Sequence, residues 1–259
     1  MSTNIHPTAL IHPSAELAPD VQVDAYAYIG PEVKIGPGSR VDHHASVDRL
    51  TTIGAGCHLW PFASVGTDPQ DLKYKGERTT LVIGDGVMIR EFTTVNRGTV
   101  EGGGVTQVGD GCLLMAYAHV AHDCHLGREV IMANSCNLAG HVALEDYVGL
   151  GGQVAVHQFT RIGRYAYVGG TSAVDKDLPP FCLCEGNRAV AHGLNVVGLK
   201  RRGFTPESME ALKAAYKIIF RTRTPLAKAM EQVRAEVPDT PEVRYLLEFI
   251  RGSQRGVAR

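Results

Sequence analysis

Aliphatic side chains recur at every sixth position along most of the chain. The row runs from Ile5 to Val65 without a missed position, resumes at Ile83, and continues from Val108 to Val174. An amphipathic helix would need a period near 3.6 residues, and a half-buried strand a period of about 2. The six-residue repeat instead predicts a parallel β-helix, in which each hexad forms one short strand and three hexads close one turn.

Two segments interrupt this repeat, 66–80 and 101–107. Repeat scaffolds carry their insertions on one face, which is often the binding face. The first segment contains Asp71, Lys73 and Arg78, which are polar enough to contact a charged substrate, although a solvated loop accounts for them equally well. We expect external loops at both places.

Helical signals replace the repeat beyond about Pro180. Three pairs each offer an N-cap hydroxyl followed by a proline suited to the first helical turn: Thr205-Pro206, Thr224-Pro225 and Thr240-Pro241. We therefore expect three main helices, with a β-helix over residues 1–187 and a C-terminal α-helical domain over 188–259. The predicted fold class is mainly β.

The charge balance excludes several classes of partner. With 26 Lys and Arg against 27 Asp and Glu, the net charge of −1 lacks the electrostatic footprint of a nucleic-acid binder. No apolar run of about 18 residues and no signal-peptide pattern is found, so we expect no membrane span and place the protein in the cytoplasm. A local cluster at Lys200, Arg201 and Arg202 fits either a phosphate-bearing or acidic partner or a solvated helix end.

Glycine and cysteine both follow the repeat. The chain has 29 glycines, about 11% against the roughly 7% of average usage, and ten of them directly follow an aliphatic hexad residue, where a Cβ is unwelcome. The six cysteines contain no C-x-x-C pair of the zinc-ribbon or thioredoxin type. Cys112, Cys124 and Cys136 fall at the small inward position, so we interpret them as core residues.

Histidines concentrate in one part of the repeat, where five of the 11 lie within 39 residues. Residues 18 apart should stack on adjacent turns at the strand spacing of about 4.8 Å. His122 is then expected beneath Gly140, and Gly140 beneath Gln158. Asp123 is expected beneath His141, which brings a carboxylate close to a second imidazole.

These columns predict a catalytic gap and a groove. The missing side chain of Gly140 should leave space above the His122 imidazole, with a free backbone N–H at its edge. An imidazole with a pKa of about 6.5 can act as a general base, and the N–H can stabilise the oxyanion of an acyl transfer. A second column, Asn134, Gly152 and Gly170, predicts a surface groove suited to an extended chain.

Two other classes of function compete with acyl transfer. His119, His122 and His125 form an H-x-x-H-x-x-H pattern that could bind zinc, as in γ-class carbonic anhydrases. The six-residue period, however, points His119 and His125 in different directions. A purely structural or docking β-helix would need neither the histidine cluster nor the glycine columns.

Six segments are more specific than the hexads: Gln70–Tyr74, Arg97–Val100, Ala118–Cys124, Leu138–His141, Val156–Phe159 and Gly198–Phe204. Through these segments the sequence resembles the UDP-N-acetylglucosamine O-acyltransferases, which catalyse the first step of bacterial lipid A synthesis. The resemblance extends over nearly the whole chain. The hexads alone would indicate only a hexapeptide-repeat acyltransferase.

The resemblance implies a left-handed β-helix in a homotrimer, with active sites between subunits and with UDP-N-acetylglucosamine and acyl carrier protein as substrates. It implies that His122 deprotonates the sugar 3-hydroxyl, which attacks the thioester of a 3-hydroxyacyl group on the carrier. Asp123 would orient His122, and the Gly140 N–H would hold the oxyanion. No metal and no cofactor beyond the carrier's phosphopantetheine thioester is expected.

The resemblance also implies binding roles. Residues that match positions holding the sugar nucleotide or lying beside the thioester are Asp71, Lys73, His119, His141, His157, Gln158, Asn195, Arg201 and Arg202. Gly170 matches the position that limits acyl length, in the groove expected at Gly152. Asn96 and Val197 stand where the best-known members have histidine and glutamate. Some members acylate a 3-amino analogue of the sugar, so an ester and an amide product are both open, and the acyl chain length is not fixed by the sequence.

Overall fold

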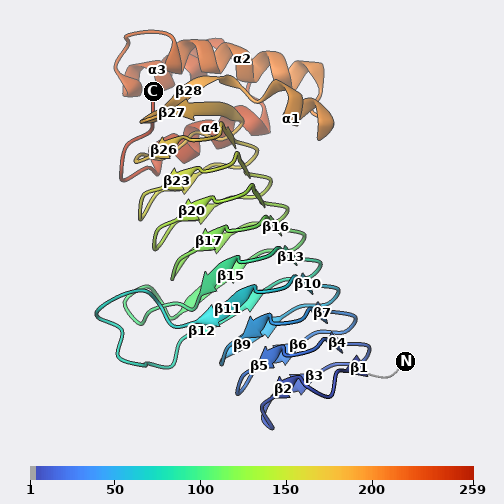
Figure 1. The fold of residues 1–259 in the computed structure, drawn as a ribbon. Helices are drawn as coiled ribbons and strands as arrows, with labels where there is room; N and C mark the ends of the chain where they lie inside the picture. The colour runs from blue at the N-terminus through green and yellow to red at the C-terminus, as the bar shows by residue number, and fades with distance from the viewer. Residues whose placement is uncertain (1–3) are drawn as a thin grey trace.

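The computed structural model describes residues 4–259, which form a three-sided coil closed by helices at its C-terminal end (Figure 1). Sheet 1 contains β1 (Asn4–Ile5), β4 (Gln22–Val23), β7 (Arg40–Val41), β10 (His58–Leu59), β13 (Met88–Ile89), β16 (Leu113–Leu114), β19 (Ile131–Met132), β22 (Gly149–Leu150), β25 (Tyr167–Val168), β27 (Cys182–Gly186) and β28 (Ala189–Leu194). Sheet 2 contains β2 (Leu10–Ile11), β5 (Tyr28–Ile29), β8 (Ser46–Val47), β11 (Ser64–Thr67), β14 (Thr94–Asn96), β17 (His119–Val120), β20 (Asn137–Leu138), β23 (Ala155–Val156) and β26 (Ala173–Val174). Sheet 3 contains β3 (Glu16–Leu17), β6 (Lys34–Ile35), β9 (Thr51–Ile53), β12 (Thr80–Ile83), β15 (Val105–Val108), β18 (His125–Leu126), β21 (Ala143–Leu144) and β24 (Arg161–Ile162).

The hexad repeat forms this coil as predicted. Strands pair in parallel with partners one turn away, so that His119 lies beside Asn137 and Val120 beside Leu138. In most two-residue strands the second, aliphatic residue is buried and the first faces outward. The predicted left-handed parallel β-helix followed by a C-terminal helical domain is confirmed.

The core explains the cysteines. Cys112, Cys124 and Cys136 are free thiols buried inside the coil, as expected for core residues. Burial raises the pKa of the Cys124 thiol to about 12, which keeps it protonated and unreactive near neutral pH. These residues therefore pack and do not take part in chemistry.

Corner geometry depends on two positions. The glycine directly after an inward aliphatic residue meets the next turn of backbone, because a Cβ on Gly36 would lie 2.5 Å from the carbonyl carbon of Gly54. The residue three after the aliphatic one adopts a left-handed conformation, as at Asp123 (φ 59°), His141 (φ 62°) and Phe159 (φ 63°). This conformation turns the chain from one sheet to the next.

Both interruptions leave the coil at the same corner, between sheets 2 and 3, where the chain swings far out from the strands (Figure 1). The first loop spans 68–79, inside the expected 66–80. The second spans 97–104 and not 101–107, because residues 105–108 pair with residues 80–83 and lengthen the strand. The hexad register did not reveal this longer pairing.

The C-terminal part begins with a hairpin. β27 pairs in parallel with β25 and antiparallel with β28, which ends the coil. Four helices follow and cover this end (Figure 1): α1 (Val196–Arg201), α2 (Pro206–Phe220), α3 (Leu226–Glu236) and α4 (Pro241–Arg251). No helix within residues 4–259 is long and apolar enough to cross a membrane.

Two of the three predicted caps are present. The hydroxyls of Thr205 and Thr240 accept from the backbone N–H groups of Ser208 and Val243 and cap α2 and α4. Thr224 does not cap α3, which begins after Pro225 without a side-chain cap. The short helix α1 was not expected, because its cap is the Asn195 amide and its apolar stripe is too short to show a period.

Candidate active site

The histidine cluster lies at the corner between sheets 2 and 3. His122 and Asp123 follow β17, and Gly140 and His141 follow β20 one turn further along the coil. The His141 N–H donates to the His122 carbonyl at 3.0 Å, and the Phe159 N–H donates to the Gly140 carbonyl at 3.2 Å. The predicted stacking of these corners is confirmed.

His122 and Asp123 form a hydrogen-bonded pair. The His122 Nδ1 and the Asp123 Oδ2 are 2.8 Å apart, with the side chains 15% and 1% exposed. Neighbouring residues in a strand would point to opposite faces. The left-handed conformation of Asp123 bends the chain, so both side chains meet on one side. A carboxylate at Nδ1 holds the proton there and leaves the Nε2 lone pair available to accept one.

Asp123 is itself held by the second loop. The backbone N–H of Thr99 donates to Oδ1 at 2.8 Å, and the Thr99 hydroxyl donates to Oδ2 at 2.6 Å. The Asp123 N–H donates to the Thr106 hydroxyl at 2.8 Å. A Cβ on Gly102 would overlap the carboxylate. Sequence reasoning missed these residues, although three consecutive glycines beginning at Gly102 were a visible sign of a close backbone approach.

Gly140 lies directly against the imidazole of His122. A Cβ there would stand 2.5 Å from Cε1 and 2.8 Å from Nε2 of that ring. The expected empty gap is therefore corrected: the ring itself occupies the space that a side chain would take. Glycine is required so that the imidazole can lie this close to the backbone.

The Gly140 N–H is not needed by the coil. Among the described residues, no backbone hydrogen bond uses it. The same hexad position, two residues after the inward aliphatic one, holds a proline in six other hexads: Pro7, Pro13, Pro19, Pro31, Pro37 and Pro61. Since proline has no N–H, this amide is dispensable for folding and free to act as a donor beside His122.

Two further imidazoles flank the pair. The His141 ring packs edge-on against His122 at 5.1 Å and stacks on Phe159 at 4.4 Å between centroids. Burial lowers the pKa of His141, although the nearby Asp123 carboxylate opposes this shift. Burial and His122 lower the pKa of His119, whose Nδ1 lies 2.7 Å from the Thr94 hydroxyl. Both rings are neutral near pH 7.

The zinc set suggested by H-x-x-H-x-x-H is not assembled. His119 lies on β17 in sheet 2 and His125 on β18 in sheet 3, where its Nδ1 is 3.2 Å from the Gln107 side-chain oxygen. A different trio, His122, Asp123 and His141, has ligand atoms within 4.8 Å of one another. Hydrogen bonds from His122 and from the loop already engage both Asp123 oxygens, which accounts for this geometry without an ion.

The first loop brings Asp71 and Lys73 to the same corner. Lys73 Nζ lies 3.1 Å from the carboxylate of Glu101 on the second loop, and Asp71 accepts from the Lys73 N–H at 3.0 Å. The two loops enclose a small cleft of about 50 Å³, lined in part by Thr99. His157 and Gln158 are exposed at this corner one turn beyond His141. The predicted substrate residues of this group therefore lie along one edge.

The remaining predicted residues lie at the other two corners. Asn195 caps α1 and donates to the Tyr165 carbonyl at 3.0 Å, while Arg202 donates to Glu129 at 2.6 Å and lies over the Tyr147 ring. Asn195 and Arg202, together with Arg201 and Val197, line a cavity of about 720 Å³ beside sheet 1.

Gly152 and Gly170 lie at the corner between sheets 1 and 2. A Cβ on Gly152 would meet the Asn134 carbonyl at 3.5 Å, and one on Gly170 would meet the Gly152 carbonyl at 3.1 Å. The predicted column is confirmed. A single chain thus distributes the predicted site residues over all three edges of the coil.

Comparison with known proteins agrees with this picture. Residues 177–258 match the family described as UDP N-acetylglucosamine O-acyltransferase, domain 2, and residues 106–140 match the bacterial transferase hexapeptide family. An acyl-(acyl-carrier-protein) UDP-N-acetylglucosamine O-acyltransferase from Thermodesulfovibrio yellowstonii is 50% identical over 255 residues, covering 98% of this chain and 99% of that protein. The enzyme of the same name from Janthinobacterium sp. is 50% identical over 259 residues, covering 98% and 99%.

Solved structures extend the likeness to the whole fold. The UDP-N-acetylglucosamine O-acyltransferase of Moraxella catarrhalis superposes with a TM-score of 0.95 at 40% identity, over 98% of this chain and 99% of the other. The UDP-N-acetylglucosamine acyltransferase of Francisella novicida gives a TM-score of 0.95 at 36% identity, over 98% and 94%.

Proposed function

The chain belongs to the UDP-N-acetylglucosamine O-acyltransferase family and is an acyltransferase, and on this premise we propose that His122 is the general base of its reaction. The acceptor is the 3-hydroxyl of UDP-N-acetylglucosamine, and the donor is a 3-hydroxyacyl group bound as a thioester to acyl carrier protein. This transfer is the first step of lipid A biosynthesis.

The proposed step begins with proton transfer. The Nε2 of His122 accepts the proton of the sugar 3-hydroxyl, whose oxygen attacks the thioester carbonyl carbon. The buried Asp123 carboxylate, 2.8 Å from Nδ1, stabilises the imidazolium that forms. The proton is therefore held next to the reacting atoms.

The tetrahedral intermediate carries an oxyanion, which the unused Gly140 N–H can bind. Its collapse breaks the carbon–sulfur bond, and the phosphopantetheine thiolate takes the proton back from His122. An ester and a free thiol result. The observation that carries this proposal is the His122 imidazole, with its lone pair on Nε2, lying against the Gly140 backbone, whose N–H enters no backbone hydrogen bond among the described residues.

Binding of the substrates requires more than one subunit. The His122 edge supplies Asp71, Lys73, His119, His141, His157 and Gln158, whereas Asn195, Arg201 and Arg202 lie at another edge of the same chain. A rotationally symmetric trimer places one edge of a subunit against a different edge of its neighbour. We propose that the homotrimer completes the site in this way, with the second edge meeting the nucleotide phosphates and the Gly152 and Gly170 groove taking the acyl chain.

The test supplies the purified protein with UDP-N-acetylglucosamine, or its 3-amino analogue, and 3-hydroxyacyl carrier proteins of graded length. Formation of the 3-O-acyl product by the wild type and its loss in His122→Ala support the proposal. Acylation of the amino analogue alone would make the protein the amide-forming variant of the family. No acylation of either sugar would refute the proposed function.

A further inference from the structure

The segment that leaves β14 contains two residues that reach in different directions. We infer that Arg97 and Thr99 are positioning residues for separate parts of the site: Arg97 fixes the 68–79 loop, and Thr99 fixes Asp123. This inference rests on the proposed function, because it assigns these residues effects on sugar-nucleotide binding and on the chemical step.

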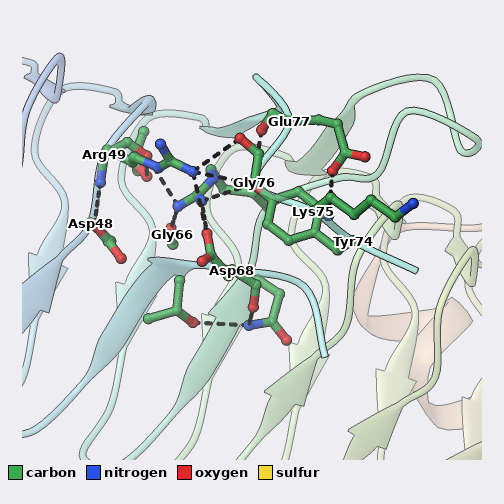
Figure 2. A network of polar contacts seen from close by, with 12 residues as sticks. Asp48, Arg49, Gly66, Asp68, Tyr74, Lys75, Gly76 and Glu77 are labelled. Atoms are coloured by element: carbon green, nitrogen blue, oxygen red, sulfur yellow. Dashed lines mark hydrogen bonds and ion pairs between the residues drawn. The ribbon is translucent and has the colours of Figure 1, made fainter. Parts of the chain in front are cut away.

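Arg97 is fully buried, yet it holds an exposed loop. One terminal nitrogen donates to the Gly66 carbonyl and the other to the Asp68 carboxylate, and the latter also donates to the Tyr74 hydroxyl at 3.3 Å. Tyr74 in turn donates to the Glu77 carbonyl at 2.8 Å. Figure 2 shows Asp68 and Tyr74 drawn together in this network of polar contacts.

The anchored residues bracket the predicted substrate contacts. Asp71 and Lys73 lie between Asp68 and Tyr74 in the chain, so fixing the two ends fixes the segment that carries them. A buried guanidinium is stable only while its hydrogen bonds are made. Arg97 therefore ties the conformation of this exposed segment to the coil.

Thr99 acts on the other side. It is 6% exposed and donates to both oxygens of Asp123, at 2.8 Å from its N–H and 2.6 Å from its hydroxyl. The second of these oxygens is also the one bonded to His122. Removing the Thr99 hydroxyl takes one hydrogen-bond donor from the buried Asp123 carboxylate and lets that carboxylate rotate. The His122 imidazole, which is hydrogen-bonded to it, then shifts as well.

Gly98 joins the two anchors rigidly. A Cβ there would overlap the backbone at the start of β15, so the segment runs in direct contact with that strand. Arg97 and Thr99 thus hold their targets from one fixed stretch of backbone, while contacting different parts of the site.

The test compares steady-state constants of four variants in the intact protein. Thr99→Val should lower kcat by on the order of 10- to 100-fold, with KM for UDP-N-acetylglucosamine within about twofold of wild type. Thr99→Ser keeps the donor and should restore most of kcat. Arg97→Lys should raise that KM roughly tenfold or more with a small change in kcat, and Tyr74→Phe should move KM in the same direction by less.

Matched controls separate positioning from general stability. Thr93→Val removes another buried hydroxyl, one that donates to the Met115 carbonyl at a different corner, and Arg40→Lys changes an arginine on sheet 1. Both should leave the constants unchanged. Melting temperature and oligomer size are measured for every variant. If Arg97→Lys fails to fold, Tyr74→Phe carries the test of the loop. If Thr99→Val fails to fold, Thr99→Ala compared with Thr99→Ser carries the test of the contact with Asp123.

A double-mutant cycle decides whether Thr99 acts through Asp123. In an Asp123→Asn background, Thr99→Val should cost less than threefold in kcat. An undiminished effect there, or a rise in KM without a fall in kcat, overturns the inference about Thr99. If both Arg97→Lys and Tyr74→Phe lower kcat without raising KM, the inference that Arg97 positions the 68–79 loop is overturned. The proposed function fails separately, if the wild type forms no acyl-sugar.

Discussion

Substitution of Gly140 separates the two roles that its position performs. In Gly140→Ala the new Cβ would stand 2.5 Å from His122 Cε1, whereas an ordinary contact needs at least 3.4 Å, so the ring must move by about 0.9 Å. A misplacement of about 1 Å in a catalytic group can cost on the order of 100-fold in rate. We expect a loss of that size in kcat.

Gly140→Pro makes the same ring displacement and also removes the N–H. The coil should accept it, because Pro13 and Pro31 already occupy the same hexad position at this corner between sheets 2 and 3. Loss of one oxyanion donor costs about 10²- to 10³-fold in kcat. The ratio between the proline and alanine variants therefore measures the contribution of the amide.

The assay is single-turnover acyl transfer at saturating substrates, with the melting temperature and oligomer size of each variant as controls. Both variants should melt close to the wild type. Equal rates for Gly140→Pro and Gly140→Ala, with both proteins folded, would refute the assignment of this amide as the oxyanion donor.

Four other outcomes follow from the site. His122→Ala should lose about 10²- to 10⁴-fold in acyl transfer while keeping its oligomer size by gel filtration, and near-normal turnover would contradict the general-base role. A strong chelator should leave the rate unchanged, and inhibition reversed by added zinc would instead support a metal at His122, Asp123 and His141. Gly170→Met should shift the preferred acyl donor to shorter chains in a competition assay, with an unshifted preference counting against the groove. Burial lowers the pKa of His119 below its usual value of about 6.5, so at mildly acidic pH the unfolded chain binds a proton that the folded chain does not. The contribution of His119 to the free energy of unfolding should therefore be fully present above about pH 6.5 and be lost as the pH drops toward the folded pKa. Urea midpoints from pH 7.5 to 5 should show this slope, and His119→Gln should flatten it.

The parts predicted from the sequence are those governed by the repeat. Since residues 18 apart stack, simple addition placed His122 beneath Gly140 and aligned Gly152 with Gly170, and both alignments are present. The repeat also predicted that Cys112, Cys124 and Cys136 are core residues, and they are buried. Position in the sequence was enough here because each turn between residues 108 and 174 has 18 residues.

Prediction failed where the repeat is broken. Thr99 and Arg97 lie in a loop with no register, so nothing in their spacing indicated that one contacts Asp123 and the other the 68–79 loop. The strand extension at 105–107 was missed for the same reason. The six-residue period already argued against the zinc set, and the structure agrees, because His119 and His125 lie on different faces of the coil. The handedness and the trimer came from the family resemblance alone.

The spare amide at the second corner position has an evolutionary consequence. Proline can occupy this position without loss of the coil, so folding does not require the N–H at these corners. The core residues that stabilise the coil are different residues from those at this position. A histidine at one level and a glycine at the next are enough to place an imidazole against such a donor. New active sites can therefore arise on this scaffold through few substitutions and at little risk to stability, which makes the β-helix a favourable starting point for diverging transferases.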